Sequence, residues 1–94
     1  MMIYQLIYTN SFKKDLRLAK KRNYDMKKME EVLTLLKSGK KLPRKYKDHQ
    51  LKGNLSKFRE LHIQPDWLLI YTKNDTELIL TLSRTGSHSE LLKL

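Results

Sequence analysis

The sequence predicts an α+β fold, in which a twisted, mainly antiparallel sheet carries two N-terminal helices packed on one face. Apolar residues recur at helical spacing over residues 12–36, whereas residues 58–82 are rich in β-branched, aromatic and aliphatic residues. The polar segments within this second half are short, as antiparallel connections require. At 94 residues, the chain is expected to form one domain, residues 1–94.

A strand and a helix are expected first. Residues 3–8 contain strand formers and almost nothing polar, which is typical of a strand inside a sheet. Asn10 or Ser11 can cap the helix that follows. Its apolar stripe has the spacing i, i+4, i+7 and consists of Phe12, Leu16 and Ala19.

A second helix is expected after a break at residues 22–24. Asp25 is its predicted cap, and Gly39 is expected to end it in the left-handed conformation. The apolar positions of this helix are Met29, Val32, Leu33 and Leu36.

Residues 37–59 are predicted to form an irregular and strongly positive segment. It contains nine Lys or Arg residues against one acid, Asp48, and glycine and proline interrupt it. A solvated charge run is the usual explanation of such a composition. Because Tyr46 and His49 are interleaved with the cations, a groove that binds phosphates is the alternative.

The second half is expected to supply the main strands. A hairpin over residues 58–71 bends at residues 64–66, where Pro65 cannot donate to a ladder. A turn at residues 74–75 leads to the last strand, residues 78–82. Residues 89–94 can form one helical turn.

Composition restricts the function. Twenty Lys and Arg against ten Asp and Glu give a formal charge of +10, which favours a polyanionic partner, with nucleic acid first, or an acidic protein. No signal peptide or membrane span is apparent, and cysteine is absent, so a cytoplasmic location is expected. No Gly-rich phosphate loop is present, and the three histidines lack metal-site spacing, so neither cofactor nor metal is expected.

The histidines, carboxylates and cations of this chain are residue types that can cleave RNA without a metal ion. The 2′-hydroxyl is the nucleophile, and the protein must move protons and neutralise charge. Each residue also has a structural explanation, such as a turn for Asp66 or the core for Trp67. The candidate catalytic residues are His49, His62 and Asp66. The candidate substrate-binding residues are Tyr46 and Trp67 for stacking and Lys47 and Arg59 for charge.

Three blocks of sequence closely resemble the YafQ branch of the RelE-like toxins, the toxins of bacterial type II toxin-antitoxin pairs. They are Tyr-Lys-Asp-His-Gln-Leu-Lys-Gly at 46–53, Phe-Arg-Glu-Leu-His-Ile-Gln-Pro-Asp-Trp-Leu-Leu-Ile-Tyr at 58–71 and Arg-Thr-Gly-Ser-His at 84–88. The resemblance implies a RelE-like microbial RNase fold and an endoribonuclease (mRNA interferase) that cleaves mRNA in the ribosomal A site. It also implies a cognate acidic antitoxin, through which alone DNA is contacted.

The resemblance further implies that His88 is the general acid, with Asp66, His49 or His62 as the base, and that Arg84 belongs to the substrate-binding residues. Glu60 is a lower-ranked catalytic candidate because its strand parity matches that of His62. One departure is Leu92, where family members tend to have an aromatic residue. A non-catalytic RNA- or ribosome-binding module remains the alternative, because the charge alone would suffice for it. A DNA-binding protein ranks lower, since no helix-turn-helix pattern is found.

Overall fold

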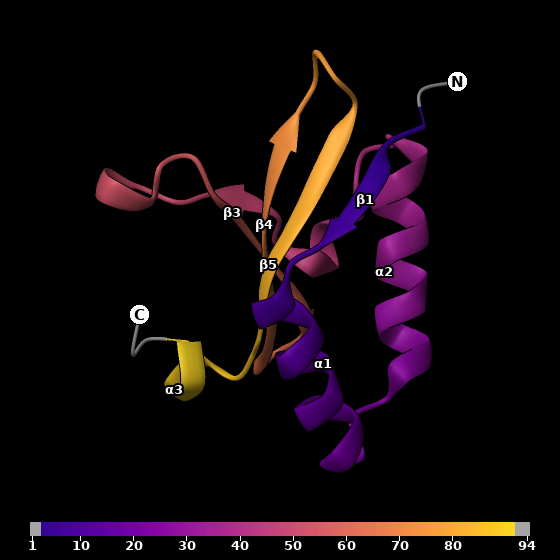
Figure 1. Cartoon of the computed structure of the whole chain (residues 1–94), viewed down its shortest axis with the longest axis vertical. Helices are drawn as coiled ribbons and strands as arrows, with labels where there is room; N and C mark the ends of the chain where they lie inside the picture. Colours follow the sequence, from indigo (N-terminus) through magenta and orange to yellow (C-terminus); the bar gives the residue numbers. More distant parts are fainter. Residues whose placement is uncertain (1–2, 92–94) are drawn as a thin grey trace.

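The computed structural model describes residues 3–91, which form an open five-stranded sheet with three α-helices (Figure 1). The strand order is β1-β5-β4-β3-β2, and every neighbouring pair is antiparallel except β1 and β5. The predicted fold class is therefore confirmed. The elements are β1 (Gln5–Tyr8), α1 (Asn10–Lys21), α2 (Met26–Ser38), β2 (His49–Gln50), β3 (Arg59–Gln64), β4 (Trp67–Asn74), β5 (Ile79–Gly86) and α3 (His88–Leu91), with 3₁₀ turns at Arg44–Tyr46 and Gly53–Leu55.

The position of β1 differs from its prediction. It pairs only with β5 among the described strands, so it is an edge strand instead of an interior one. Ile7 and Tyr8 are consequently 42% and 39% exposed. The interior strand is β5, which lies between β1 and β4 and continues to Gly86, four residues beyond its predicted end.

The helix termini follow local capping chemistry. Thr9, not Asn10 or Ser11, caps α1, and its Oγ1 accepts a hydrogen bond from the N–H of Phe12 at 3.1 Å. The same hydroxyl lies 2.8 Å from the carbonyl of Leu82, which fixes the start of α1 against β5. For α2, the predicted cap Asp25 and the left-handed residue Gly39, with φ 75°, are both confirmed.

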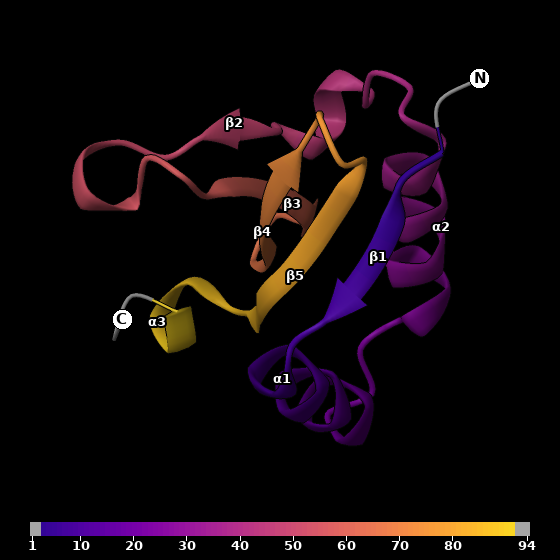
Figure 2. The same ribbon diagram turned by 45° about the horizontal axis from the view of Figure 1, so that its top comes forward.

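The two long helices cover one face of the sheet, as predicted (Figures 1 and 2). Because strand side chains alternate between faces, the buried residues form two separate sets. Those on the helix-covered face include Phe12, Ala19, Met29, Val32, Leu36, Leu61, Ile63, Trp67, Leu69, Tyr71, Leu80 and Leu82. Those on the opposite face, where α3 packs, are Leu68, Ile70 and Leu91, with Phe58 beside them. No helix within residues 3–91 is long and apolar enough to cross a membrane.

The hairpin of β3 and β4 turns at Pro65 and Asp66, as predicted. On β3, the side chains of Glu60 and His62 face away from α1 and α2. The segment expected to be irregular over residues 37–59 contains a short strand, β2, which places His49 opposite Glu60. This pairing brings residues 11 positions apart onto one open face.

Candidate active site

The turn between β3 and β4 and the start of α3 bring Asp66 and His88 into contact. Oδ1 of Asp66 accepts hydrogen bonds from the backbone N–H of His88 at 2.9 Å and from its Nδ1 at 2.7 Å. The backbone bond, followed by the ring bond, holds the pKa of Asp66 below its ordinary value because both stabilise the carboxylate. With Nδ1 bonded to Asp66, Nε2 of His88 is the atom that can exchange a proton with a ligand.

Glu60 lies between two other imidazoles on the same open face. Its Oε1 is 3.6 Å from Nε2 of His49 and 3.7 Å from Nε2 of His62. The Nδ1 atom of His49 lies 2.7 Å from the carbonyl oxygen of Lys47, which selects the tautomer protonated at Nδ1. Nε2 of His49 is thereby directed at Glu60.

The five predicted catalytic residues therefore come together. The rings of His62 and His88 have centroids 5.5 Å apart, which joins the two groups of contacts. We call the resulting series, His49, Glu60, His62, His88 and Asp66, the acid–base row. It places carboxylate and imidazole groups, the types that serve in general acid–base catalysis, from four segments on one face. Their catalytic roles stay predictions.

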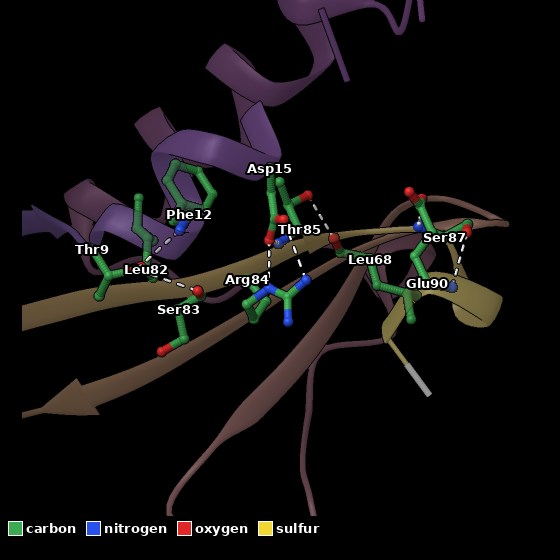
Figure 3. A network of polar contacts seen from close by, with 10 residues as sticks. All are labelled: Thr9, Phe12, Asp15, Leu68, Leu82, Ser83, Arg84, Thr85, Ser87 and Glu90. Atoms are coloured by element: carbon green, nitrogen blue, oxygen red, sulfur yellow. Dashed lines mark hydrogen bonds and ion pairs between the residues drawn. The ribbon is translucent and has the colours of Figure 1, made fainter. Parts of the chain in front are cut away.

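A capping box that was not anticipated from the sequence fixes the start of α3 (Figure 3). Oγ of Ser87 accepts from the N–H of Glu90 at 3.3 Å, and Oε1 of Glu90 accepts from the N–H of Ser87 at 2.9 Å. The other carboxylate oxygen of Glu90 pairs with Arg22, which caps the C-terminus of α1. The signal for the box was the Ser-x-x-Glu pattern at residues 87–90. His88 is the first residue of the capped helix, so these contacts determine its position.

Trp67 and Tyr46, predicted to stack on a base, lie in the core. Their exposed fractions are 1% and 5%. The ring of Tyr24 meets Trp67 edge-on at a centroid distance of 4.9 Å, and Nε1 of Trp67 has no hydrogen-bond partner among the described residues. The prediction is corrected because β4 directs Trp67 toward the helices, where other side chains already cover its faces.

Arg59, predicted to bind substrate, lies on the helix-covered side of β3. Arg59 and Leu61 point to the same face of β3, opposite to His62, because side chains alternate along a strand. Its Nη2 is 3.0 Å from Oδ2 of Asp48, and Asp48 also accepts a hydrogen bond from the hydroxyl of Tyr71. Burial, followed by this bond to Asp48, raises the pKa of Tyr71. Arg59 thus has a structural partner and faces away from the row.

Arg84 is also paired with a carboxylate (Figure 3). Its Nε and Nη2 donate to the two oxygens of Asp15 on α1 at 2.6 and 3.2 Å, and this raises the pKa of Arg84. The N–H of Thr85 donates to the same carboxylate at 3.1 Å. Asp15 therefore ties α1 to the end of β5, immediately before His88. A contact between Arg84 and substrate stays a prediction.

The remaining predictions concern Lys47, metal and Leu92. Lys47 is exposed and lines a pocket beside His62, so its substrate contact stays a prediction. Within residues 3–91, no three His, Cys, Asp or Glu side chains are grouped so as to hold a metal ion. Leu92 lies outside the described residues.

Known proteins resemble this chain over nearly all of its length. Residues 4–93 match the family described as bacterial toxin of type II toxin-antitoxin system, YafQ. The mRNA interferase toxin YafQ of Escherichia coli K12 is 42% identical over 85 residues, which cover 89% of this chain and 90% of that protein.

Solved structures agree with this match. The crystal structure of the E. coli DinJ-YafQ toxin-antitoxin complex gives a TM-score of 0.86 at 40% identity, covering 94% of this chain and 96% of that one. A metal-bound toxin from Helicobacter pylori gives 0.86 at 43% identity, covering 96% and 99%. From the family match and this level of identity, we conclude that the chain belongs to the YafQ family of bacterial toxins of type II toxin-antitoxin systems.

Proposed function

We propose that this toxin is an endoribonuclease that cleaves messenger RNA and thereby stops translation. The observation that supports it is the acid–base row, in which the His62 and His88 rings lie 5.5 Å apart. The E. coli relative is named an mRNA interferase, which supports the substrate class. A non-catalytic RNA-binding module would use the charge of +10 but would not require converging imidazoles and carboxylates.

The contacts suggest a division of roles in the row. Asp66 holds the ring and backbone of His88, so we assign it to orientation and His88 to general acid. His49 and His62 both lie next to Glu60, and we assign His62 as the general base because its ring is 5.5 Å from that of His88. The base removes the 2′-hydroxyl proton, the 2′-oxygen bonds to phosphorus, and the bond to the 5′-oxygen breaks as His88 protonates it. The products are a 2′,3′-cyclic phosphate and a 5′-hydroxyl.

This route needs no metal because the RNA carries its nucleophile and side chains fill both proton-transfer roles. Charge on the phosphorane must still be neutralised. Arg59 and Arg84 are paired with carboxylates, whereas Lys47 is exposed beside His62. Lys47 is therefore the cation that we expect nearest the reacting phosphate.

The test uses two RNAs of the same sequence. The first contains ribose throughout, and the second carries one 2′-deoxyribose at the cut site. Wild-type protein should cleave the first and leave the second intact. His88→Ala should bind both RNAs, leave the second intact and cleave the first about 10²- to 10⁴-fold more slowly than wild type. Lys14→Ala, on the outer surface of α1, is the control and should cleave normally. Cleavage of the deoxy substrate, or full activity without His88, would contradict the mechanism.

We further propose a cytoplasmic location, action on messages in the ribosomal A site, and inhibition by an acidic antitoxin. The E. coli relative has been crystallised with DinJ, which supports a protein inhibitor. The excess of ten positive charges favours an acidic inhibitor segment that folds on binding. Its affinity should therefore fall as salt rises, and an affinity indifferent to ionic strength would refute the electrostatic part. Toe-printing on programmed ribosomes would locate the cut.

A further inference from the structure

A pocket of about 410 Å³ adjoins the acid–base row at His62 and contacts none of the other four residues of the row. α2, the turn at residues 45–47 and the end of β3 form its walls. The polar residues that line it are Lys28, Glu31, Lys45, Lys47, His62 and Gln64. This volume lies within the range of small-ligand pockets, about 300–1,000 Å³. A ligand reacting at His62 would therefore extend into it.

The edge of β3 beside this pocket has no neighbouring strand among the described residues. β2 pairs only with Arg59 and Glu60. The carbonyl of Phe58 accepts from the N–H of Leu51, and backbone groups alternate in direction along a strand, so the N–H and C=O of His62 also point outward. The pocket wall thus offers a backbone donor and a backbone acceptor in addition to side chains.

The lining combines two kinds of chemistry. Lys28, Lys45 and Lys47 make no ion pair within residues 3–91, in contrast to Arg59 and Arg84. Three unpaired cations suit the phosphates of an RNA strand. A carboxylate in such a place repels phosphate and therefore needs another partner. A hydrogen-bond donor on a base edge is a partner of this kind.

We propose that the pocket binds the nucleotide next to the cut site and contacts the edge of its base. Glu31 accepts a hydrogen bond from an exocyclic amino group, Gln64 completes the contact through its amide, and Lys28 and Lys45 contact the flanking phosphates. Bases with an exocyclic amino group are preferred to uracil because the one donor on the uracil edge, N3–H, lies between two carbonyl oxygens that the Glu31 carboxylate repels. This inference rests on the proposed endoribonuclease function and names the part of the substrate that determines specificity.

The test first maps the cut made by wild-type protein, on free RNA and on programmed ribosomes. RNAs differing only in the nucleotide on one or the other side of the cut are then compared. Glu31→Gln adds a hydrogen-bond donor. The ratio of the cleavage rate with an amino-bearing base to that with uracil should therefore fall by about tenfold. Glu30→Gln is the matched control, since Glu30 is an exposed neighbour on α2 that does not line the pocket. Equal base preferences in wild type and Glu31→Gln would overturn the inference, whereas cleavage of the RNA would still support the endoribonuclease function.

The phosphate contacts are tested by binding to the RNA with a 2′-deoxy cut site. The double variant Lys28→Ala/Lys45→Ala should lower the slope of log Kd against log salt by about 0.7 for each phosphate that is no longer neutralised. Lys14→Ala/Lys21→Ala removes the same charge from α1 and should leave the slope nearly unchanged. If the pocket variants bind this RNA with the wild-type slope but no longer bind the antitoxin, the pocket is a protein-binding site and the proposal fails. If wild-type protein cleaves nothing, the proposed function fails, and the same salt titration on the unmodified RNA still decides whether RNA occupies the pocket.

Discussion

Replacing Glu90 by alanine is expected to loosen the helix that carries His88. The change removes the bond from the N–H of Ser87 and the pair with Arg22. Removal of a helix cap costs about 0.5–2 kcal/mol, and an ion pair between exposed side chains is worth about 0–1 kcal/mol. We therefore expect the docking of α3 to weaken by about 1–2 kcal/mol.

This change matters because α3 has few other contacts that hold it. A helix of four residues is not stable alone in water. Two other contributions come from the bonds that His88 donates to Asp66 and from Leu91, which is 4% exposed and whose burial contributes about 1.5–3 kcal/mol. The capping box and the Arg22 pair are thus one of three sets of contacts that keep His88 near His62.

Glu90→Gln separates the two contacts. Glutamine can still accept from the N–H of Ser87, as in a capping box, but forms no ion pair with Arg22. Its effect should be below about 1 kcal/mol and should equal that of Arg22→Ala. Glu90→Ala should weaken the docking of α3 more than either of these two variants.

Amide hydrogen exchange measures this docking directly. The N–H of Leu91 donates to the carbonyl of Ser87 at 3.1 Å, so its exchange reports the opening of α3. Glu90→Ala should accelerate it about 5- to 30-fold, with the amide of Leu69 in the core as the unaffected reference. Exchange of Leu91 at the wild-type rate in Glu90→Ala would refute this account of how His88 is held.

The same contacts predict a pH dependence. The hydrogen bond from the N–H of Ser87, and then the Ser87 hydroxyl and Arg22, lower the pKa of Glu90 from its ordinary 4.5. A lowered folded-state pKa stabilises the protein above the unfolded value, and this stabilisation is lost as the pH falls through the folded value. The difference in Leu91 exchange between wild type and Glu90→Gln should accordingly be full near neutral pH and shrink below about pH 4.5.

Three further results are expected. Asp48→Asn weakens the bonds to Arg59 and Tyr71 and should destabilise the fold by about 1–3 kcal/mol in urea unfolding, with little change in cleavage by the folded fraction. Asp66→Asn retains both acceptor contacts to His88 but not the charge, so single-turnover cleavage should slow by about tenfold or more while RNA affinity is kept. Chelator should leave cleavage unchanged; activity abolished by chelator and restored by added metal would show that a metal takes part.

Elements with a strong local signal were predictable from the sequence. The apolar spacing of α2, the carboxylate of Asp25 and the glycine at position 39 each determine conformation within a few residues. Proline at position 65 likewise defined the turn of the hairpin. The parity of β3 placed Glu60 and His62 on one face, which the structure has.

Features that depend on contacts between segments far apart in the sequence were not predictable in the same way. An apolar strand can be interior or at an edge, so β1 was misplaced, although Ile7 and Tyr8 look suited to burial. Trp67 was expected to be free to stack because its neighbours in sequence suggested a site, whereas alternation along β4 directs it into the core. The pair of Arg22 with Glu90 joins residues 68 positions apart, and no local pattern predicts it.

The arginines and lysines near the acid–base row have different partners, which indicates that they have different roles. Arginine forms planar, two-pronged bonds to carboxylate, and both Arg84 and Arg59 use this geometry to join separate segments, through Asp15 and Asp48. Lysine is a flexible point charge, and the three lysines near His62 are unpaired within residues 3–91. Neutralising an arginine partner should therefore affect stability, whereas neutralising a pocket lysine should affect RNA affinity and its salt dependence. The two classes of variant should separate in paired measurements of unfolding and binding.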